Sequence, residues 1–143
     1  MKIKHTLHTL VATGLLVLSQ AASAQIAVIV NTKSPLASMT QEQVAAIFLG
    51  KTSQLPSGVT ARPADLPESS SVRDQFYSKA AGKSSAQVKA TWARLTFSGK
   101  ATPPREMSTA ADVKKHVASN VEAIGYIEQS AVDSSVKVVL VVD

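Results

Sequence analysis

The sequence predicts an α/β domain in which helices flank a small mixed sheet. Short β-branched segments lie at both ends of residues 25–143, and helical segments that stop at glycines lie between them. Strands at the two ends of a chain with helices between them fit a mixed sheet covered by helices. Residues 25–143 are enough for one domain of ordinary size and too few for two.

Residues 1–24 have the pattern of a cleaved secretory signal peptide. Lys2 and Lys4 supply a positive start, a short apolar stretch follows, and residues 22–24 read Ala-Ser-Ala, which fits a cleavage site. The apolar stretch is too short to span a bilayer, and no later segment is long enough. The sequence contains no cysteine, so neither an acylated anchor nor a disulfide is expected. We therefore expect a periplasmic protein without a membrane anchor.

The first expected strand covers residues 26–30, a β-branched run that ends at Asn31. A helix follows at Thr40, because Thr40 and Gln43 have the spacing of a capping box. Gly50 is placed to end this helix in a left-handed conformation.

A second short strand is expected over residues 59–62, because Pro63 limits how far it can pair. The loop after it leads into a second helix, for which Ser71 and Asp74 form a capping arrangement. Gly82 ends that helix.

Ser84 and Gln87 form another capping box and open a third helix that runs up to Gly99. Two prolines then prevent continuation. The last helix is expected over residues 109–119, with Asn120 as its left-handed cap.

The chain returns to strand over residues 123–127 and 136–142. The second of these strands is strongly apolar, and an exposed apolar strand is an aggregation hazard. We therefore expect residues 136–142 inside the sheet, with both faces covered.

The residues required by common catalytic and metal sites are missing. His116 is the only histidine outside residues 1–24, and a solvated position on the last helix is its expected role. Without cysteine or a dense acidic loop, no metal, cofactor or enzyme chemistry is predicted. The formal charge of +5 falls to +3 without Lys2 and Lys4. Because these charges are dispersed, nucleic acid is not an expected partner.

The segment over residues 67–76 is the one that suggests binding. Ser69, Ser70 and Ser71 precede a helix, whose first amides and positive dipole end favour an anion such as phosphate or sulfate. Arg62 and Arg73 could add charge-assisted hydrogen bonds. The alternative is that the serines only cap the helix, and Glu68 would compete with an anion there.

The order of motifs resembles a known family. The chain carries, in sequence, IAVIVN, TQEQVAAIFLGK, SSSVRDQFY, AGKSSAQVKATWARLTFSGKATPP, EAIGYI and VKVVLVV. This order is similar to that of the periplasmic phosphate-binding proteins of ABC transporters, and above all to their short, single-lobe relatives. The resemblance covers nearly all of residues 25–143 and implies a single lobe of the type II periplasmic-binding-protein fold.

The resemblance also implies where a ligand would bind. In the full-length relatives, part of the phosphate site is a serine-glycine-threonine loop at the start of a helix, preceded by an arginine. The matching segment here is Ser69 to Ser71, in which serines replace the glycine and the threonine. The resemblance covers a single lobe and implies that the second is missing, so weak anion binding is expected, because these proteins gain affinity by closing two lobes around the ligand.

Two kinds of function remain open on the sequence. The first is an extracytoplasmic solute-binding-like protein that binds phosphate or a similar oxyanion and serves ABC-type uptake, with a permease as partner. The second is a periplasmic protein-interaction or sensory module that keeps the fold without a ligand and has an envelope protein as partner. Two copies could also pair as a homodimer and rebuild a cleft.

Overall fold

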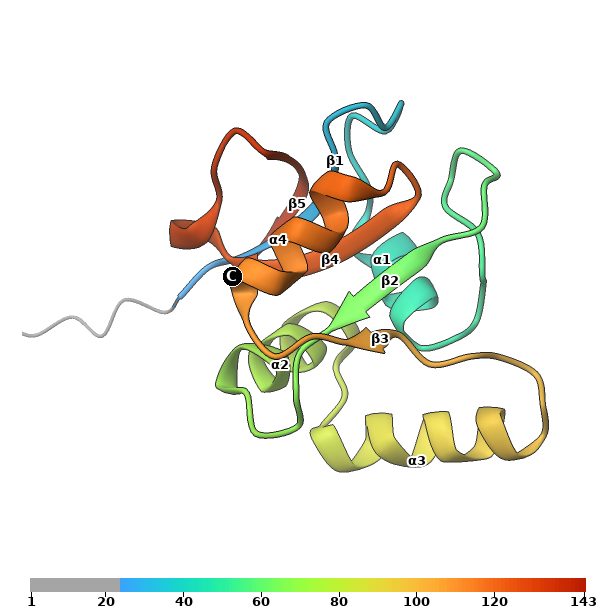
Figure 1. Cartoon of the computed structure of the whole chain (residues 1–143). Coiled ribbons are helices and arrows are strands. Elements are labelled where there is room, and N and C mark those ends of the chain that lie inside the picture. The colour runs from blue at the N-terminus through green and yellow to red at the C-terminus, as the bar shows by residue number, and fades with distance from the viewer. Residues whose placement is uncertain (1–23) are drawn as a thin grey trace, which may run out of the picture.

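The computed structural model describes residues 24–143 (Figure 1). The predicted signal peptide, residues 1–24, lies outside the described residues except for Ala24, and it stays a prediction. Five strands form the sheet: β1 Ile26–Asn31, β2 Arg62–Asp65, β3 Arg105–Glu106, β4 Ala123–Glu128 and β5 Val136–Val142. Four α-helices accompany it: α1 Gln41–Phe48, α2 Ser71–Phe76, α3 Ser85–Phe97 and α4 Ala110–Ser119. The predicted α/β class with a small mixed sheet is confirmed.

The sheet has the strand order β3-β2-β4-β1-β5. Strand β2 runs parallel to both β3 and β4, whereas β1 is antiparallel to both β4 and β5. The carboxyl ends of β3, β2 and β4 therefore lie at the same edge of the sheet. Helix α2 begins just beyond that edge, after the loop that follows β2.

Helices cover both faces of the sheet. Val113 and Val117 of α4 pack against Gly125 of β4, where an added Cβ would lie 2.6 Å from a Val113 methyl. Tyr126, the next residue of β4, points to the opposite face, where its ring stacks on Phe76 of α2 at a centroid distance of 3.9 Å. The alternation of side chains along β4 thus joins α4 on one face to α1 and α2 on the other.

Helix α3 lies at one end of the molecule, away from the sheet (Figure 1). Of its residues only Val88 is fully buried. Trp92 is half-buried and donates from Nε1 to the carbonyl oxygen of Phe48 at 2.9 Å, which ties α3 to the end of α1. This helix therefore has fewer links to the core than α4.

Strand β5 lies at the edge of the sheet, so the prediction of an interior position is wrong. Among the strands of residues 24–143, β5 pairs with β1 alone. The loop over residues 32–40 shields the free edge, because the Met39 amide donates to the Val139 carbonyl at 2.9 Å. Lys137 also donates to the Ser34 carbonyl at 2.6 Å. A loop therefore gives this apolar strand the protection that a further strand was expected to give.

The second strand lies later in the sequence than predicted, at Arg62–Asp65 instead of residues 59–62, and it contains Pro63. Pairing with β4 involves Arg62 and Pro63, whereas pairing with β3 involves Ala64 and Asp65. Pro63 therefore has a paired strand on one side only, which is the position a sheet tolerates for proline.

Local helix signals were predicted well at most ends. The capping boxes at Thr40 and Ser84 are both present, and Gly50, Gly82 and Gly99 all have positive φ angles. Two predictions are wrong. Ser70, not Ser71, caps α2, and Asn120 is extended at φ −134° instead of left-handed. Its side chain donates to the His116 carbonyl instead.

No helix within residues 24–143 is both long and apolar enough to cross a membrane.

Candidate anion-binding site

The candidate site lies where β2 ends and α2 begins. Asp65 is the last residue of β2, and residues 66–70 connect it to α2, which starts at Ser71. In open α/β sheets, ligands bind outside the carboxyl ends of the strands. The serine segment singled out in the sequence therefore lies at the edge of the sheet where a ligand would be expected.

The three serines have different roles. Ser70 is the N-cap of α2: its Oγ accepts from the Arg73 amide at 3.3 Å, and its carbonyl accepts from Asp74. Ser69 and Ser71 are exposed, and their hydroxyls have no hydrogen-bond partner within residues 24–143. The amides of Ser71 and Val72 lie in the first turn, where no intrahelical acceptor exists. Two hydroxyls and two amides are thus available to an anion.

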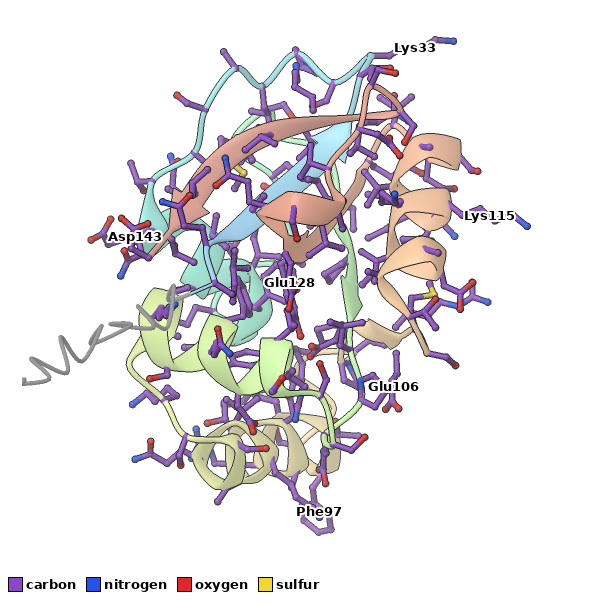
Figure 2. All side chains as sticks on the ribbon, turned by 90° about the vertical axis from the view of Figure 1, so that its left-hand side faces the viewer. Lys33, Phe97, Glu106, Lys115, Glu128 and Asp143 are labelled. Carbon is purple, nitrogen blue, oxygen red and sulfur yellow. The ribbon has the colours of Figure 1, made fainter. Side chains whose placement is uncertain are left out.

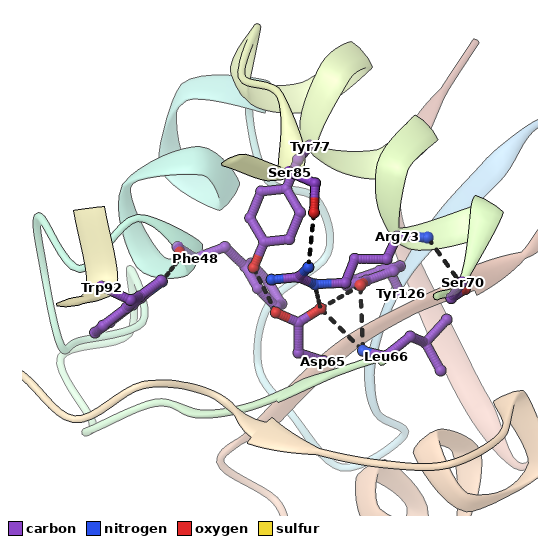
Figure 3. A network of polar contacts seen from close by, with 9 residues as sticks. All are labelled: Phe48, Asp65, Leu66, Ser70, Arg73, Tyr77, Ser85, Trp92 and Tyr126. Atoms are coloured by element: carbon purple, nitrogen blue, oxygen red, sulfur yellow. Dashed lines mark hydrogen bonds and ion pairs between the residues drawn. The ribbon is translucent and has the colours of Figure 1, made fainter. Parts of the chain in front are cut away.

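The Arg73 side chain turns away from these donors and into the protein. Its side chain is about a tenth exposed, its Nε lies 3.4 Å from Oδ1 of Asp65, and its Nη1 donates to Ser85 Oγ at 3.3 Å. The guanidinium carbon also lies 5.2 Å from the centroid of the Tyr77 ring. Figure 3 shows the guanidinium directed at Asp65 and Ser85. The Arg73 side chain therefore links the start of α2 to Asp65 of β2 and Ser85 of α3 inside the protein.

Asp65 is the centre of this buried network. Its carboxylate accepts from the Leu66 amide at 2.9 Å, from the Tyr77 hydroxyl at 2.6 Å, and from the Tyr126 hydroxyl. Two phenols and one guanidinium thus converge on one carboxylate. The negative charge of Asp65 offsets the positive charge of Arg73, so the network has little net charge.

The pKa shifts follow from this arrangement. Burial, together with the charge of Asp65 and a hydrogen bond to it, raises the pKa of Tyr77 and of Tyr126 far above the usual range. Burial alone would lower the pKa of Arg73, but attraction to Asp65 and the neighbouring phenols raises it overall. Both tyrosines therefore stay neutral donors, and Arg73 stays charged.

Arg62 lies at the opposite end of β2 from the serines. Its exposed side chain donates to Asn120 Oδ1 at 3.0 Å and lies 3.5 Å from a Glu122 carboxylate oxygen. Glu68 lies in the loop before α2, and its carboxylate is 3.7 Å from Lys89 of α3. Of the five residues proposed from sequence, the structure brings together the three serines and the backbone of Arg73.

The sequence reasoning missed the polar network behind the serines. Arg73 and Tyr77 are four residues apart and lie on one face of a helical segment, and that spacing was the available signal. The partners that complete the network, Asp65 and Tyr126, are 61 residues apart in the chain. No local pattern predicts that their side chains meet.

A separate cleft of about 660 Å³ lies between the end of α1 and α3. Gly50, Lys51, Trp92 and Lys100 are among its lining residues, and none of the three serines is. This cleft is therefore distinct from the serine segment. Residues 24–143 also contain no cluster of acidic and histidine side chains that could hold a metal ion.

Comparison with solved structures identifies the fold. A phosphate ABC transporter substrate-binding protein from Clostridium perfringens, solved with bound phosphate, matches 81% of this chain with a TM-score of 0.64 and 24% identity. An ABC-type phosphate transport receptor from Vibrio cholerae matches the same share with a TM-score of 0.64 and 23% identity. The chain has the fold of the phosphate substrate-binding proteins. The predicted resemblance is confirmed at the level of the fold.

The similarity covers only part of those proteins. This chain spans 45% of the Clostridium structure and 46% of the Vibrio structure. PstS from Borrelia burgdorferi gives the same picture, with a TM-score of 0.60, 14% identity and 47% of its length covered. No protein-family model and no curated protein matches the sequence.

Proposed function

We propose that this protein is an extracytoplasmic, phosphate-binding-like lobe that binds phosphate or a similar oxyanion weakly, without covalent chemistry. Its role would be in ABC-type phosphate uptake, with a permease as partner. The anion would lie against the hydroxyls of Ser69 and Ser71 and the first amides of α2. Arg62 is left out of this site, because its side chain is engaged at the other end of β2.

One observation carries the proposal: unpaired donors lie in the segment that follows the carboxyl end of β2. These donors are the Ser69 and Ser71 hydroxyls and the Ser71 and Val72 amides, and Asp65 holds the Arg73 side chain inside the protein. A helix start attracts anions through its amides and its dipole. The similarity in fold to proteins described as phosphate-binding supports the choice of anion.

The charges predict weak affinity. Asp65 offsets the charge of Arg73, and Glu68 adds a negative charge near the same loop. An anion in an open site also keeps much of its water, so screening reduces its attraction to the protein. We expect binding in the millimolar range, which corresponds to about 4 kcal/mol.

Calorimetry with phosphate and with sulfate tests this site on residues 24–143, which contain every described strand and helix. Replacing Ser69 and Ser71 with alanine should abolish the heat, while Ser70 remains to cap α2. A matched double substitution of two exposed serines elsewhere, Ser57→Ala with Ser119→Ala, should leave it unchanged. No heat at millimolar anion, or equal heat in both variants, contradicts the proposal.

The second candidate is a protein-interaction or sensory module in the envelope that has lost the ligand. The Asp65–Arg73 pair favours it, because the charge of Arg73, a buried cation near the serines, is already neutralised. Crosslinking in the envelope would then recover a stable partner, and calorimetry would give no heat with either anion. Recovery of no partner together with serine-dependent heat would decide for the first candidate.

A further inference from the structure

An aromatic side chain at the end of α3 is almost fully exposed. Phe97 is 95% exposed, more than any other large apolar side chain in residues 24–143. It points away from the body of the molecule at the tip of α3 (Figure 2). Ala93 and Ala90, one and two turns earlier, are also exposed, so the outer side of this helix end is apolar where a polar surface is usual.

The segment that contains α3 has a net positive charge. From residue 75 to residue 104 the sequence has five lysines and arginines and no acidic residue. Arg94 and Lys100 flank Phe97 at a distance of three residues on each side, and neither forms an ion pair within the described residues. Lys51 lines the same cleft as Lys100, and that cleft has no acidic lining residue.

Phe97, Arg94 and Lys100 lie within seven residues of one another at the end of α3 and define one surface; Lys51 belongs to the neighbouring cleft. A helix end with exposed cations around a protruding aromatic ring suits the interface of an anionic bilayer, where the ring inserts and the cations meet headgroups. The ring projects outward from a convex helix end, so a fluid surface fits it without a preformed pocket.

We propose that this surface docks on a membrane that contains anionic phospholipids. Docking is peripheral, with Phe97 in the headgroup region and Arg94 and Lys100 against lipid phosphates. The surface is separate from the serine segment, so this inference does not depend on the proposed anion site. Docking would hold the protein at a membrane surface while leaving the start of α2 open.

Cosedimentation with lipid vesicles tests the proposal on residues 24–143. The protein should pellet with vesicles of phosphatidylglycerol mixed with phosphatidylcholine at low salt, and pelleting should be lost with phosphatidylcholine alone or at high salt. Arg94→Gln with Lys100→Gln should lower binding about 25-fold, at about fivefold for each basic residue. The matched control, Lys33→Gln with Lys115→Gln, also loses two positive charges, but at exposed lysines outside this surface. It should bind like the wild type.

Phe97→Ala separates lipid insertion from charge attraction. Because the ring makes almost no contact with the core, this variant should fold normally and bind anionic vesicles about tenfold more weakly. Val121→Ala, at a half-exposed apolar side chain outside α3, is the control and should change nothing.

Three results would overturn the proposal. Equal pelleting with and without phosphatidylglycerol would remove the role of charge. Undiminished binding by Phe97→Ala, with equal affinity for soluble polyglutamate, would indicate an acidic protein as the partner. A dimer in light scattering that Phe97→Ala dissociates would show that a second copy covers the ring.

Discussion

A single carboxylate, Asp65, organises the polar interior of this protein. It accepts from two phenols and a backbone amide and lies beside the guanidinium of Arg73. A buried charge is costly unless it is paired and hydrogen-bonded. The network therefore fixes the end of β2 against the start of α2. The exposed serines lie in the segment between these two fixed elements.

Asp65→Asn should be strongly destabilising because it leaves Arg73 buried without a counter-charge. Removing one partner of a buried pair costs about 3–5 kcal/mol, measured as the free energy of unfolding in urea. Glu122→Gln removes one partner of the exposed pair with Arg62 and should cost less than about 1 kcal/mol. Equal costs for the two substitutions would show that the Asp65 network is not tightly coupled.

The two tyrosines predict how stability changes at alkaline pH. Their pKa values are raised in the folded protein, so folding is favoured fully below the ordinary phenol pKa of about 10 and less so above it. Each phenol should lower the free energy of unfolding by about 1.4 kcal/mol per pH unit above pH 10. Tyr77→Phe removes one of the two phenols, so it should reduce the slope by about 1.4 kcal/mol per pH unit.

Urea unfolding at several alkaline pH values measures this slope. Tyr77 and Tyr126 are the only tyrosines in the chain, so phenolate absorbance provides a second reading: it should appear only as the protein unfolds. Phenolate absorbance in the folded protein near pH 10, or parallel slopes for wild type and variant, would contradict the prediction.

Helices and strands differ in how far the sequence predicts them. The caps at Thr40 and Ser84 depend on residues three apart, so the sequence displays them directly. The position of β5 depends on which strands it meets, and its apolar side chains suit a sheet interior as well as a shielded edge. The sequence predicts the helix caps because they depend on neighbouring residues. Strand order and the Asp65 network depend on contacts between residues that are distant in the sequence.

The contact between α1 and α3 depends on a glycine. Gly50 has a φ of +72°, and a Cβ there would lie 2.7 Å from a Leu95 methyl and 2.9 Å from the Trp92 ring. Gly50→Ala should therefore cost about 1–2 kcal/mol for backbone strain and about 1 kcal/mol or more for crowding. Gly99 has a φ of +68° with open space around it. Gly99→Ala should therefore cost only the backbone strain of about 1–2 kcal/mol.

Denaturant unfolding compares these two variants, and the emission of Trp92, the only tryptophan, reports on the contact itself. The emission should shift in Gly50→Ala and stay unchanged in Gly99→Ala. Equal stability and equal emission would mean that α3 adjusts to the added methyl group without loss.

The whole molecule combines a tightly packed sheet with a loosely attached end. Every residue of β1 is buried, and β1 pairs with a strand on each side. Helix α4 is anchored on β4 through Val113 and Val117. Helix α3 is joined mainly through Val88, Trp92 and Leu95, and most of its residues are exposed. Stability should therefore be unequal across the chain, because weakly packed elements open without global unfolding.

Native-state hydrogen exchange should resolve this difference. The amides of β1 and β4 should exchange only through global unfolding, and those in the centre of α4 close to that limit. The amides of α3 should exchange with a free energy lower by about 2 kcal/mol or more, because opening this helix exposes little buried surface. Gly50→Ala should lower the protection of α3 amides from exchange more than that of α4 amides, because the added methyl group would clash with Trp92 and Leu95. Protection of α3 equal to that of β1 would show that the α3 end unfolds with the sheet as one unit.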